Sequence, residues 1–300
     1  MNNEINLYDV KERLKYAGFG TQFNAELEKR VAAGEIDIKM SRVETVNGFT
    51  MKYEPEIAIK EDNVYYNGMR ATRTELETGK EISQWFSSKI GITKREAENL
   101  LSDTENPRAA FKGHFNDQNE LQHSWVSINF KAPLTDSGNH QLSFFSSAYS
   151  ASIADRLTDF TFLELQDQAI SREVVKSLQK GETITLTPRE DSDYKKVLAY
   201  VNASKGTLTI MDESGTMLKH DQFRTPEAKK RHQESRADWM TRQTQEGGRQ
   251  TDPTEQPGQH QSAAPETGIT STGEPPTTID RKRLPKNPIK GQDPSAMKHP

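Results

Sequence analysis

The sequence predicts an α+β protein made of repeated modules, each with a helix followed by three short antiparallel strands. The clearest copy has an amphipathic helix at residues 171–180 that ends at Gly181, followed by apolar segments at 184–186, 197–201 and 208–210. Two similar successions precede it, with helices that begin near residues 22 and 94. Their spacings of about 72 and 78 residues exceed most solenoid periods, so we expect modules that lie side by side.

Five segments are expected. They are an N-terminal module (1–90), a second module (91–168), a third module (169–222), a basic helical segment (223–245) and a Pro-rich tail (246–300). The tail holds nine of the 14 prolines and only five residues from the set Val, Ile, Leu, Met, Phe, Trp and Tyr. It cannot bury enough apolar surface to offset chain entropy, so we expect it to be disordered.

The first module begins with predicted helices at 9–16 and 22–33. Asp9 and Glu12 have capping-box spacing, Thr21 suits the second N-cap, and Gly34 ends the second helix. Alternating apolar residues at 36–40 and 49–53 flank Asn47–Gly48, which predicts a hairpin.

The later strands of this module carry two interrupting signals. Pro55 removes a ladder donor, which favours an edge position or a break. A third strand at 64–69 is expected to turn at Asn67–Gly68, and a strand at 82–87 is expected to connect to the second module.

The second module opens on a capping box formed by Thr93 and Glu96, with Ala97, Leu100 and Leu101 as the apolar helix face. Its strands are predicted at 110–115, 125–130 and 141–145, and a helical segment at 152–157 leads to the third module. Residues 227–245 are predicted to be a poorly amphipathic helix.

Composition and charge limit the functions that the chain can have. With no cysteine, disulfides, thiol catalysis and Cys-ligated metal sites are excluded. The chain from Phe223 onward has 13 basic and 10 acidic residues, which leaves 27 basic and 34 acidic residues before it. An acidic body is not typical of a protein that coats DNA. We find no signal-peptide pattern and no apolar run of membrane-spanning length, so we expect a cytoplasmic protein.

Two stretches resemble a known family. One is the helix, turn and strands from Lys180-Gly181-Glu182 to Val197-Leu-Ala-Tyr-Val201, and the other is Gly91-Ile-Thr-Lys-Arg-Glu-Ala-Glu-Asn-Leu-Leu101 followed by Trp125-Val-Ser-Ile-Asn-Phe130. Both are similar to uncharacterised domains carried on conjugative and integrative elements of Bacteroidota, with related units appended to topoisomerase-like proteins. The resemblance covers residues 9–222 and implies a cytoplasmic accessory role on a mobile element. It implies no reaction.

Candidate catalytic and metal-binding residues are few. His114 and His123 flank a predicted hairpin that contains Asp117, but no H-E-x-x-H spacing occurs, and a polar turn is the favoured interpretation. The pair Gly18 and Gly20 follows a helix and lacks the third glycine of a dinucleotide site. No G-x-S-x-G motif or Walker pattern occurs. We therefore expect no catalytic residue, cofactor or metal, and infer no small-molecule ligand.

Aromatic residues on the predicted strands could stack bases. Because adjacent strand residues face opposite sides, one ring of each neighbouring pair should pack in a core, and core packing is the favoured interpretation. The candidates are Tyr65, Tyr66, Trp85, Phe86, Trp125, Phe144 and Phe145.

Two basic clusters remain as candidate contacts for nucleic acid or a partner. The first lies in the helical segment, where Trp239 also suggests a docking motif, and the second lies in the tail; together they comprise Lys229, Lys230, Arg231, Arg236, Trp239, Arg281, Lys282 and Arg283. A solvated linker needs charge as well, which is the alternative explanation.

The sequence thus favours a non-enzymatic accessory protein that binds DNA or a DNA-processing complex. The alternative is a scaffold that binds proteins through sheet edges or exposed faces, with the tail as a spacer. An enzyme is the least favoured class.

Overall fold

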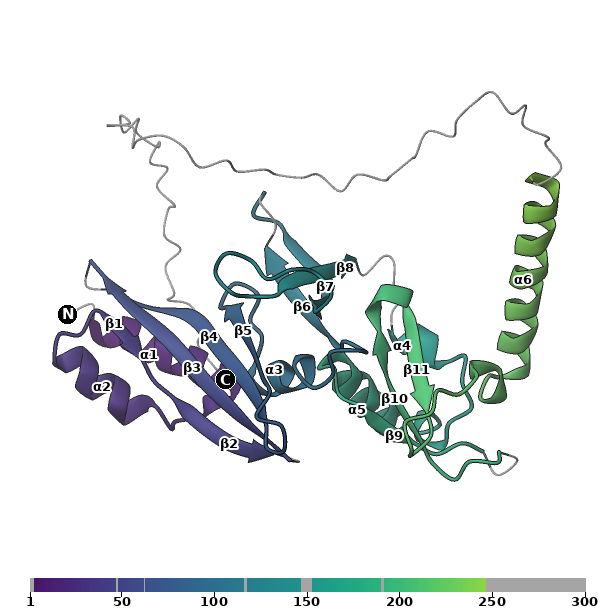
Figure 1. Cartoon of the computed structure of the whole chain (residues 1–300), viewed down its shortest axis with the longest axis horizontal. Helices are drawn as coiled ribbons and strands as arrows, with labels where there is room; N and C mark the ends of the chain where they lie inside the picture. The colour runs from purple at the N-terminus through teal and green to yellow at the C-terminus, as the bar shows by residue number, and fades with distance from the viewer. Residues whose placement is uncertain are drawn as a thin grey trace, which may run out of the picture. The chain divides into compact units, whose positions relative to one another are not determined.

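The computed structural model describes residues 3–46, 48–61, 63–115, 118–146, 153–189 and 192–246, without the side chains of 3–5 and 238–246. The described residues form helices and three antiparallel sheets, which confirms the predicted α+β class (Figure 1). Residues 247–300, nearly all of the tail expected to be disordered, lie outside the described part. No helix in the described part is long and apolar enough to cross a membrane.

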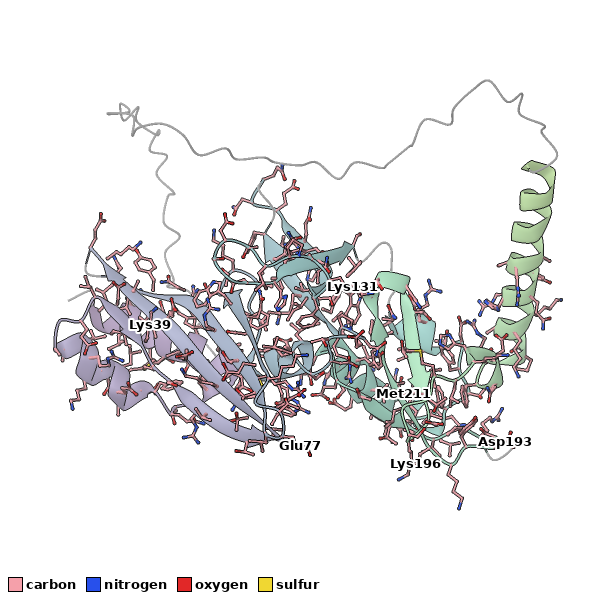
Figure 2. The ribbon with its side chains drawn as sticks, viewed as in Figure 1. Lys39, Glu77, Lys131, Asp193, Lys196 and Met211 are labelled. Atoms are coloured by element: carbon pink, nitrogen blue, oxygen red, sulfur yellow. The ribbon has the colours of Figure 1, made fainter. Side chains whose placement is uncertain are left out.

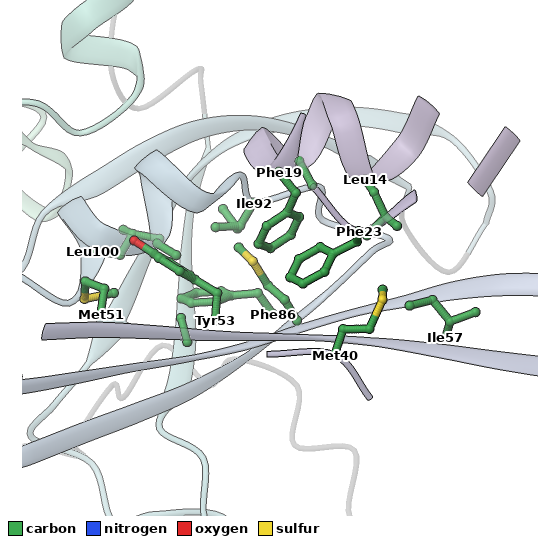
Figure 3. Close-up of a cluster of buried hydrophobic side chains, with 14 of the residues drawn as sticks. Leu14, Phe19, Phe23, Met40, Met51, Tyr53, Ile57, Phe86, Ile92 and Leu100 are labelled. Carbon is green, nitrogen blue, oxygen red and sulfur yellow. The ribbon is translucent and has the colours of Figure 1, made fainter. Parts of the chain in front are cut away.

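The N-terminal sheet contains five strands, β1 (Asp37–Lys39), β2 (Arg42–Val46), β3 (Phe49–Lys60), β4 (Asn63–Glu75) and β5 (Glu81–Ser87). β3, β4 and β5 are neighbours in that order, and β1 and β2 pair with the other side of β3. One face is covered by α1 (Asn3–Leu14), a π-helical turn (Lys15–Phe19) and α2 (Asn24–Ala32) (Figure 1). Phe19 and Phe23 point from this helical layer toward Met40 and Tyr53, and all four are buried (Figure 3).

The helix starts differ from the prediction. Asp9 lies inside α1, so the expected cap at this residue is wrong. α2 begins at Asn24 with Phe23 at the N-cap position and no side-chain hydrogen bond, so Thr21 is not its cap. The end at Gly34 is confirmed: this residue has φ of +78° and its N–H donates to the carbonyl of Val31 (3.0 Å).

The hairpin at Asn47–Gly48 is confirmed, but its first strand is β2 and not residues 36–40. Val46 pairs with Phe49 across the turn, and Gly48 has φ of +83°. β1 is a separate short strand, and Ile36, just before it, is 65% exposed.

Pro55 lies in the middle of β3, which is paired on both sides, so the predicted edge or break is wrong. β1 pairs with β3 as far as Glu56, and β2 pairs from Tyr53, so Pro55 faces the junction between these two strands. Its carbonyl accepts a hydrogen bond from the N–H of Met40 (3.3 Å). Because the N–H and C=O groups of one strand residue point to the same side, the missing donor also faces this junction.

The predicted turn at Asn67–Gly68 is also wrong. β4 continues through it to Glu75, with a bulge that leaves Asn67 as an extra residue opposite the step from Glu56 to Ile57. The segment at 82–87, predicted to be a connection, is part of β5, which pairs with β4 as a full member of this sheet.

The rest of the described chain contains two further helix-and-sheet units. In the first, α3 (Lys94–Leu100) precedes a meander of β6 (Ala109–Phe115), β7 (Leu121–Asn129) and β8 (Gln141–Ser146). After α4 (Ile153–Leu157), the second has α5 (Gln168–Gln179) before β9 (Ile184–Leu186), β10 (Val197–Asn202) and β11 (Thr207–Met211). Three short 3-10 segments, Leu163–Leu165, Ala203–Lys205 and His220–Gln222, and finally α6 (Pro226–Glu246) complete it.

The β6–β8 sheet lies between two hydrophobic cores. Ala110 and Ile128 pack in the core that contains the N-terminal sheet, whereas Ala109 and Trp125 pack in the core that contains α5 and β9–β11. This division follows from the strand geometry, because neighbouring residues face opposite sides of a sheet. The middle sheet therefore has one face in each core.

The loop between β7 and β8 is fixed to the edge strand of the N-terminal sheet. Gln84 of β5 is only 2% exposed; its Nε2 donates to the carbonyl of His140 (3.2 Å), and its Oε1 accepts from the His140 N–H (2.9 Å). Asn139 Oδ1 accepts hydrogen bonds from Trp85 N (3.2 Å) and Arg70 Nη1 (3.1 Å). These bonds satisfy part of the open edge of β5 and position the start of β8.

Candidate functional site

The basic residues predicted on the helical segment are not gathered on one face of α6. Lys229 and Arg236 are seven residues apart and share a face, whereas Arg231 lies on nearly the opposite side of the helix. Arg231 forms an ion pair with Asp159, and Lys230 Nζ lies 3.9 Å from Glu234 Oε1. The Trp239 side chain and Arg281, Lys282 and Arg283 lie outside the described part.

The histidines do not converge. His114 and His123 lie on opposite faces of the β6–β7 hairpin: His114 Nε2 is 3.2 Å from Ser124 Oγ, whereas His123 stacks on Phe111. Asp117 lies outside the described residues. The described part of the chain holds no group of three or more His, Asp or Glu side chains placed to bind a metal ion.

Two other histidines have lowered pKa values. Burial lowers the pKa of His140, whose ring packs edge-on against Phe130 at 4.9 Å. Burial, and then the positive charge of Arg224, lower the pKa of His220. Neutral imidazoles next to phenyl rings are consistent with packing residues, and neither histidine lines one of the cavities described below.

The arrangement with the most binding groups is a groove between the β6–β8 sheet and the end of β10, which we call the Phe145–Tyr200 groove. It has a volume of about 410 Å³. One wall is formed by β7 and β8, the second by β10 and the 3-10 segment after it, and the third by the loop before β6. The lining includes Ser127, Asn129, Ser143, Phe145, Tyr200, Asn202, Lys131, Lys205, Glu105 and Asn106.

Local turns orient the amide groups of the groove. Asn129 Oδ1 accepts from the N–H groups of Lys131 and Ala132 (both 3.2 Å), and Asn202 Oδ1 accepts from the N–H of Lys205 (3.2 Å). Each asparagine caps the turn after its own strand, so its amide oxygen already accepts hydrogen bonds from the backbone. The Nδ2 donors of both residues bond to no described group and are available to a ligand.

Positive charge surrounds the aromatic end of the groove. Lys131, just after β7 (Figure 2), and Lys205 are exposed. The Arg108 guanidinium lies 4.5 Å from the centre of the Tyr200 ring. Burial lowers the pKa of Arg108. Glu105 is the acidic residue of the lining, so the groove is locally positive although the body of the protein is acidic.

An aromatic face extends from the groove along the same side of the β6–β8 sheet. Trp125 is buried, Phe111 lies 5.3 Å from it, and the exposed ring of His123 stacks on Phe111 at 5.8 Å with an angle of 21°. The face continues to Phe115 and Leu121, which pair across the hairpin and are 63% and 59% exposed. Exposure therefore increases steadily from the core to the hairpin tip.

The structure confirms core packing for one ring of each predicted aromatic pair. Phe86 and Trp125 are buried, Tyr66 packs on the first core and Phe145 on the second, whereas Tyr65 and Phe144 are 47% and 46% exposed. Phe144 lies on the face opposite Phe145, next to His114 (5.0 Å between rings). The sequence analysis did not consider Phe111 and Tyr200, and it considered His123 only as a candidate metal ligand. The register of β6 and β7 brings His123 next to Phe111, whereas Tyr200 reaches the groove from a different sheet.

No protein-family model, curated protein or solved structure matches this chain.

Proposed function

We propose that this protein is a non-enzymatic accessory protein of a mobile genetic element and that it binds single-stranded nucleic acid in the Phe145–Tyr200 groove. The mobile-element context is proposed from the resemblance of residues 9–222 to domains carried on such elements. The observation that supports binding is the juxtaposition in the groove of the half-buried Phe145 ring, two amide donors and two lysines, with the exposed ring of His123 farther along the same face of the β6–β8 sheet.

The chemistry of this face favours a single strand over a duplex. Rings on a sheet bind unpaired bases by stacking, which contributes about 1–3 kcal/mol per base and needs the base face to be free. Lysines at the edge bind phosphates, and amide donors reach base edges. A duplex would bring more phosphates toward a body with 27 basic and 34 acidic residues before Phe223, which opposes its binding.

Fluorescence anisotropy with labelled single- and double-stranded oligonucleotides tests the proposal. We expect the full chain to bind single-stranded DNA more tightly than duplex, and His123→Ala to weaken the single-strand affinity by at least about fivefold through lost stacking. Lys131→Gln with Lys205→Gln should reduce the slope of log affinity against log salt by about 1.4, since each phosphate contact contributes about 0.7.

The matched control also removes two positive charges but leaves the groove intact. Lys176 and Lys196 are exposed, and Lys196 precedes β10, at the opposite end of this strand from Lys205 (Figure 2). Lys176→Gln with Lys196→Gln should therefore leave the salt slope unchanged. Equal slopes for the two double variants, or no binding of single strands at all, would reject the groove.

The same assay separates the groove from the tail. Arg281, Lys282 and Arg283 changed together to Gln in the full chain should lower affinity for all oligonucleotides by a similar factor. Truncation at Gln222 is unsuitable, because Phe223 is 2% exposed and packs in the second core.

A protein scaffold remains the second candidate, favoured by one observation. β8 is at the end of its sheet in the described part, and its six residues, Gln141–Ser146, carry no charge. Uncharged edge strands are open to pairing with a strand of a partner. The scaffold would replace the groove as the proposed function on two results together. The wild-type protein would not bind oligonucleotides, and Phe144→Lys would abolish co-purification of an element-encoded protein.

A further inference from the structure

We propose that a second cavity, which we call the Arg189 pocket, binds a small apolar carboxylate. It is independent of the proposed nucleic-acid site: none of its lining residues belongs to the Phe145–Tyr200 groove. Its volume is about 460 Å³, which lies within the range of small-molecule sites. It is formed by α4, the segment from Thr158 to Gln166, the first turns of α5 and Arg189 after β9.

The floor of the pocket is apolar and preformed. Phe160 and Phe162 lie nearly parallel, with ring centres 5.9 Å apart and an angle of 22°, and are 8% and 1% exposed. Leu157 (2% exposed) and Leu165 complete the floor. Phe162 also stacks on Phe223 at 5.5 Å, which fixes the floor to the core behind it. Such a surface suits an apolar ring system, because a ring that covers it removes apolar area from water.

The rim supplies hydrogen-bonding groups whose local bonds hold them in place. Thr158 Oγ1 donates to the carbonyl of Asp155 (2.6 Å), and Thr161 Oγ1 donates to the carbonyl of Phe223 (3.2 Å). Both hydroxyl protons are therefore used, so these threonines cannot donate to a ligand carboxylate, and the donors on the rim have to come from other side chains. Ser171 and Gln166 at the start of α5 complete the polar rim. A ligand with a polar group at one end and an apolar body matches this division.

The charge of the pocket indicates that the polar group is an anion. Arg189 is the charged residue among the described lining, and it forms no ion pair with a described carboxylate. Two nearby carboxylates have other partners: Asp159 pairs with Arg231, and Glu164 accepts from the N–H of Thr187 (2.9 and 3.0 Å). Asp167 caps α5 by accepting from Ala169 N and Ile170 N. Glu190 and Asp191, which follow Arg189, lie outside the described residues.

A guanidinium next to an apolar cavity binds a carboxylate well, because its donors match the two oxygens in a bidentate pair. Phosphate esters would bring a second negative charge, and the described lining holds no second cation to balance it. We therefore assign the pocket to a monoanion with one or two rings.

Titration with 2-naphthoate and with its neutral isostere 2-naphthamide tests this assignment. Isothermal titration calorimetry on the full chain should show the carboxylate binding at least about tenfold more tightly than the amide, as expected for one charge-assisted hydrogen bond. Arg189→Gln should abolish this preference. The matched control is Arg172→Gln, which removes an equal charge from the exposed surface of α5 outside the lining and should keep the preference.

A second variant tests the place of binding without touching the charge. Ala154 is exposed and lines the pocket, so Ala154→Phe should fill the cavity while the fold is kept, and 2-naphthoate affinity should fall at least about tenfold. The assignment is rejected if naphthoate does not bind, if it binds no better than the amide, or if Arg189→Gln retains the difference. Addition of a single-stranded oligonucleotide should not displace naphthoate, so this result is separate from the fate of the nucleic-acid groove.

Discussion

Gly68→Ala is expected to lower the free energy of unfolding by about 4 kcal/mol, although it adds a single methyl group. Gly68 lies at the bulge of β4 and has φ of +143°, a conformation that residues with a Cβ rarely adopt. A Cβ built there would lie 2.2 Å from the carbonyl oxygen of Phe86 and 3.0 Å from the Cα of Ser87. Both are backbone atoms of β5, so relief requires β4 and β5 to separate.

Urea unfolding followed by tryptophan fluorescence measures this loss, and Trp85 reports on the affected strand because it pairs with Arg70 in the same ladder. Gly79→Ala is the control: Gly79 has φ of +67° but nothing within 4 Å of an added Cβ. The control should lose only the backbone cost of about 1–2 kcal/mol. Similar losses for the two variants would show that the close approach of β5 has no energetic consequence.

Signals confined to a few neighbouring residues predicted part of the local structure, although the helix caps expected at Asp9 and Thr21 are wrong. Thr93 and Glu96 form the expected capping box, with both reciprocal hydrogen bonds present. The predicted hairpin between β2 and β3 is present, and Gly48 in its turn has φ of +83°, a conformation that favours glycine. Such features depend on sequence separations of two to four residues, which a sequence shows directly.

Glycine and proline were misinterpreted where their role depends on a neighbouring strand. Asn67–Gly68 has the same letters as the hairpin turn, but here the glycine accommodates a bulge and the close approach of β5. Pro55 is compatible with an interior strand because two different partners meet opposite it. Both outcomes are decided by strands that pair from elsewhere in the chain, and no local pattern contains that information.

The binding groups of the candidate groove show the same limit. Phe145 is visible in the sequence as a strand aromatic, but its neighbours are Tyr200 and Lys205, more than fifty residues later. The stacking of His123 on Phe111 depends on the register of β6 and β7, which places His123 opposite Gly113. Because Gly113 has no side chain, the His123 ring can lie over it and reach Phe111. The basic cluster of α6, which is continuous in sequence, is divided between faces by the helical repeat.

Lys112→Met is expected to cost about 3 kcal/mol of unfolding free energy, because it leaves a carboxylate without its cation in the protein interior. Lys112 Nζ lies 3.1 and 2.9 Å from the two oxygens of Glu96, and the side chains are only 16% and 7% exposed. Glu96 Oε2 also accepts from Thr93 N (2.8 Å) and Thr93 Oγ1 (3.0 Å). The carboxylate thus links the start of α3 to β6.

Glu96→Gln in the Lys112→Met background separates lost charge pairing from lost packing. A glutamine at this position can still complete the capping box, but it carries no charge that needs a partner. The double variant should therefore recover about 2 kcal/mol relative to Lys112→Met alone in the same urea unfolding measurement, since the desolvated charge is gone.

For comparison, Lys176→Met breaks an ion pair with Glu173 at the surface, where the two side chains are 62% and 70% exposed. This variant should lower the free energy of unfolding by less than about 0.5 kcal/mol. If the single and double variants at the buried pair were equally unstable, Glu96 would not be a buried charge held by Lys112, and the loss would have to come from the packing of the lysine chain against α3.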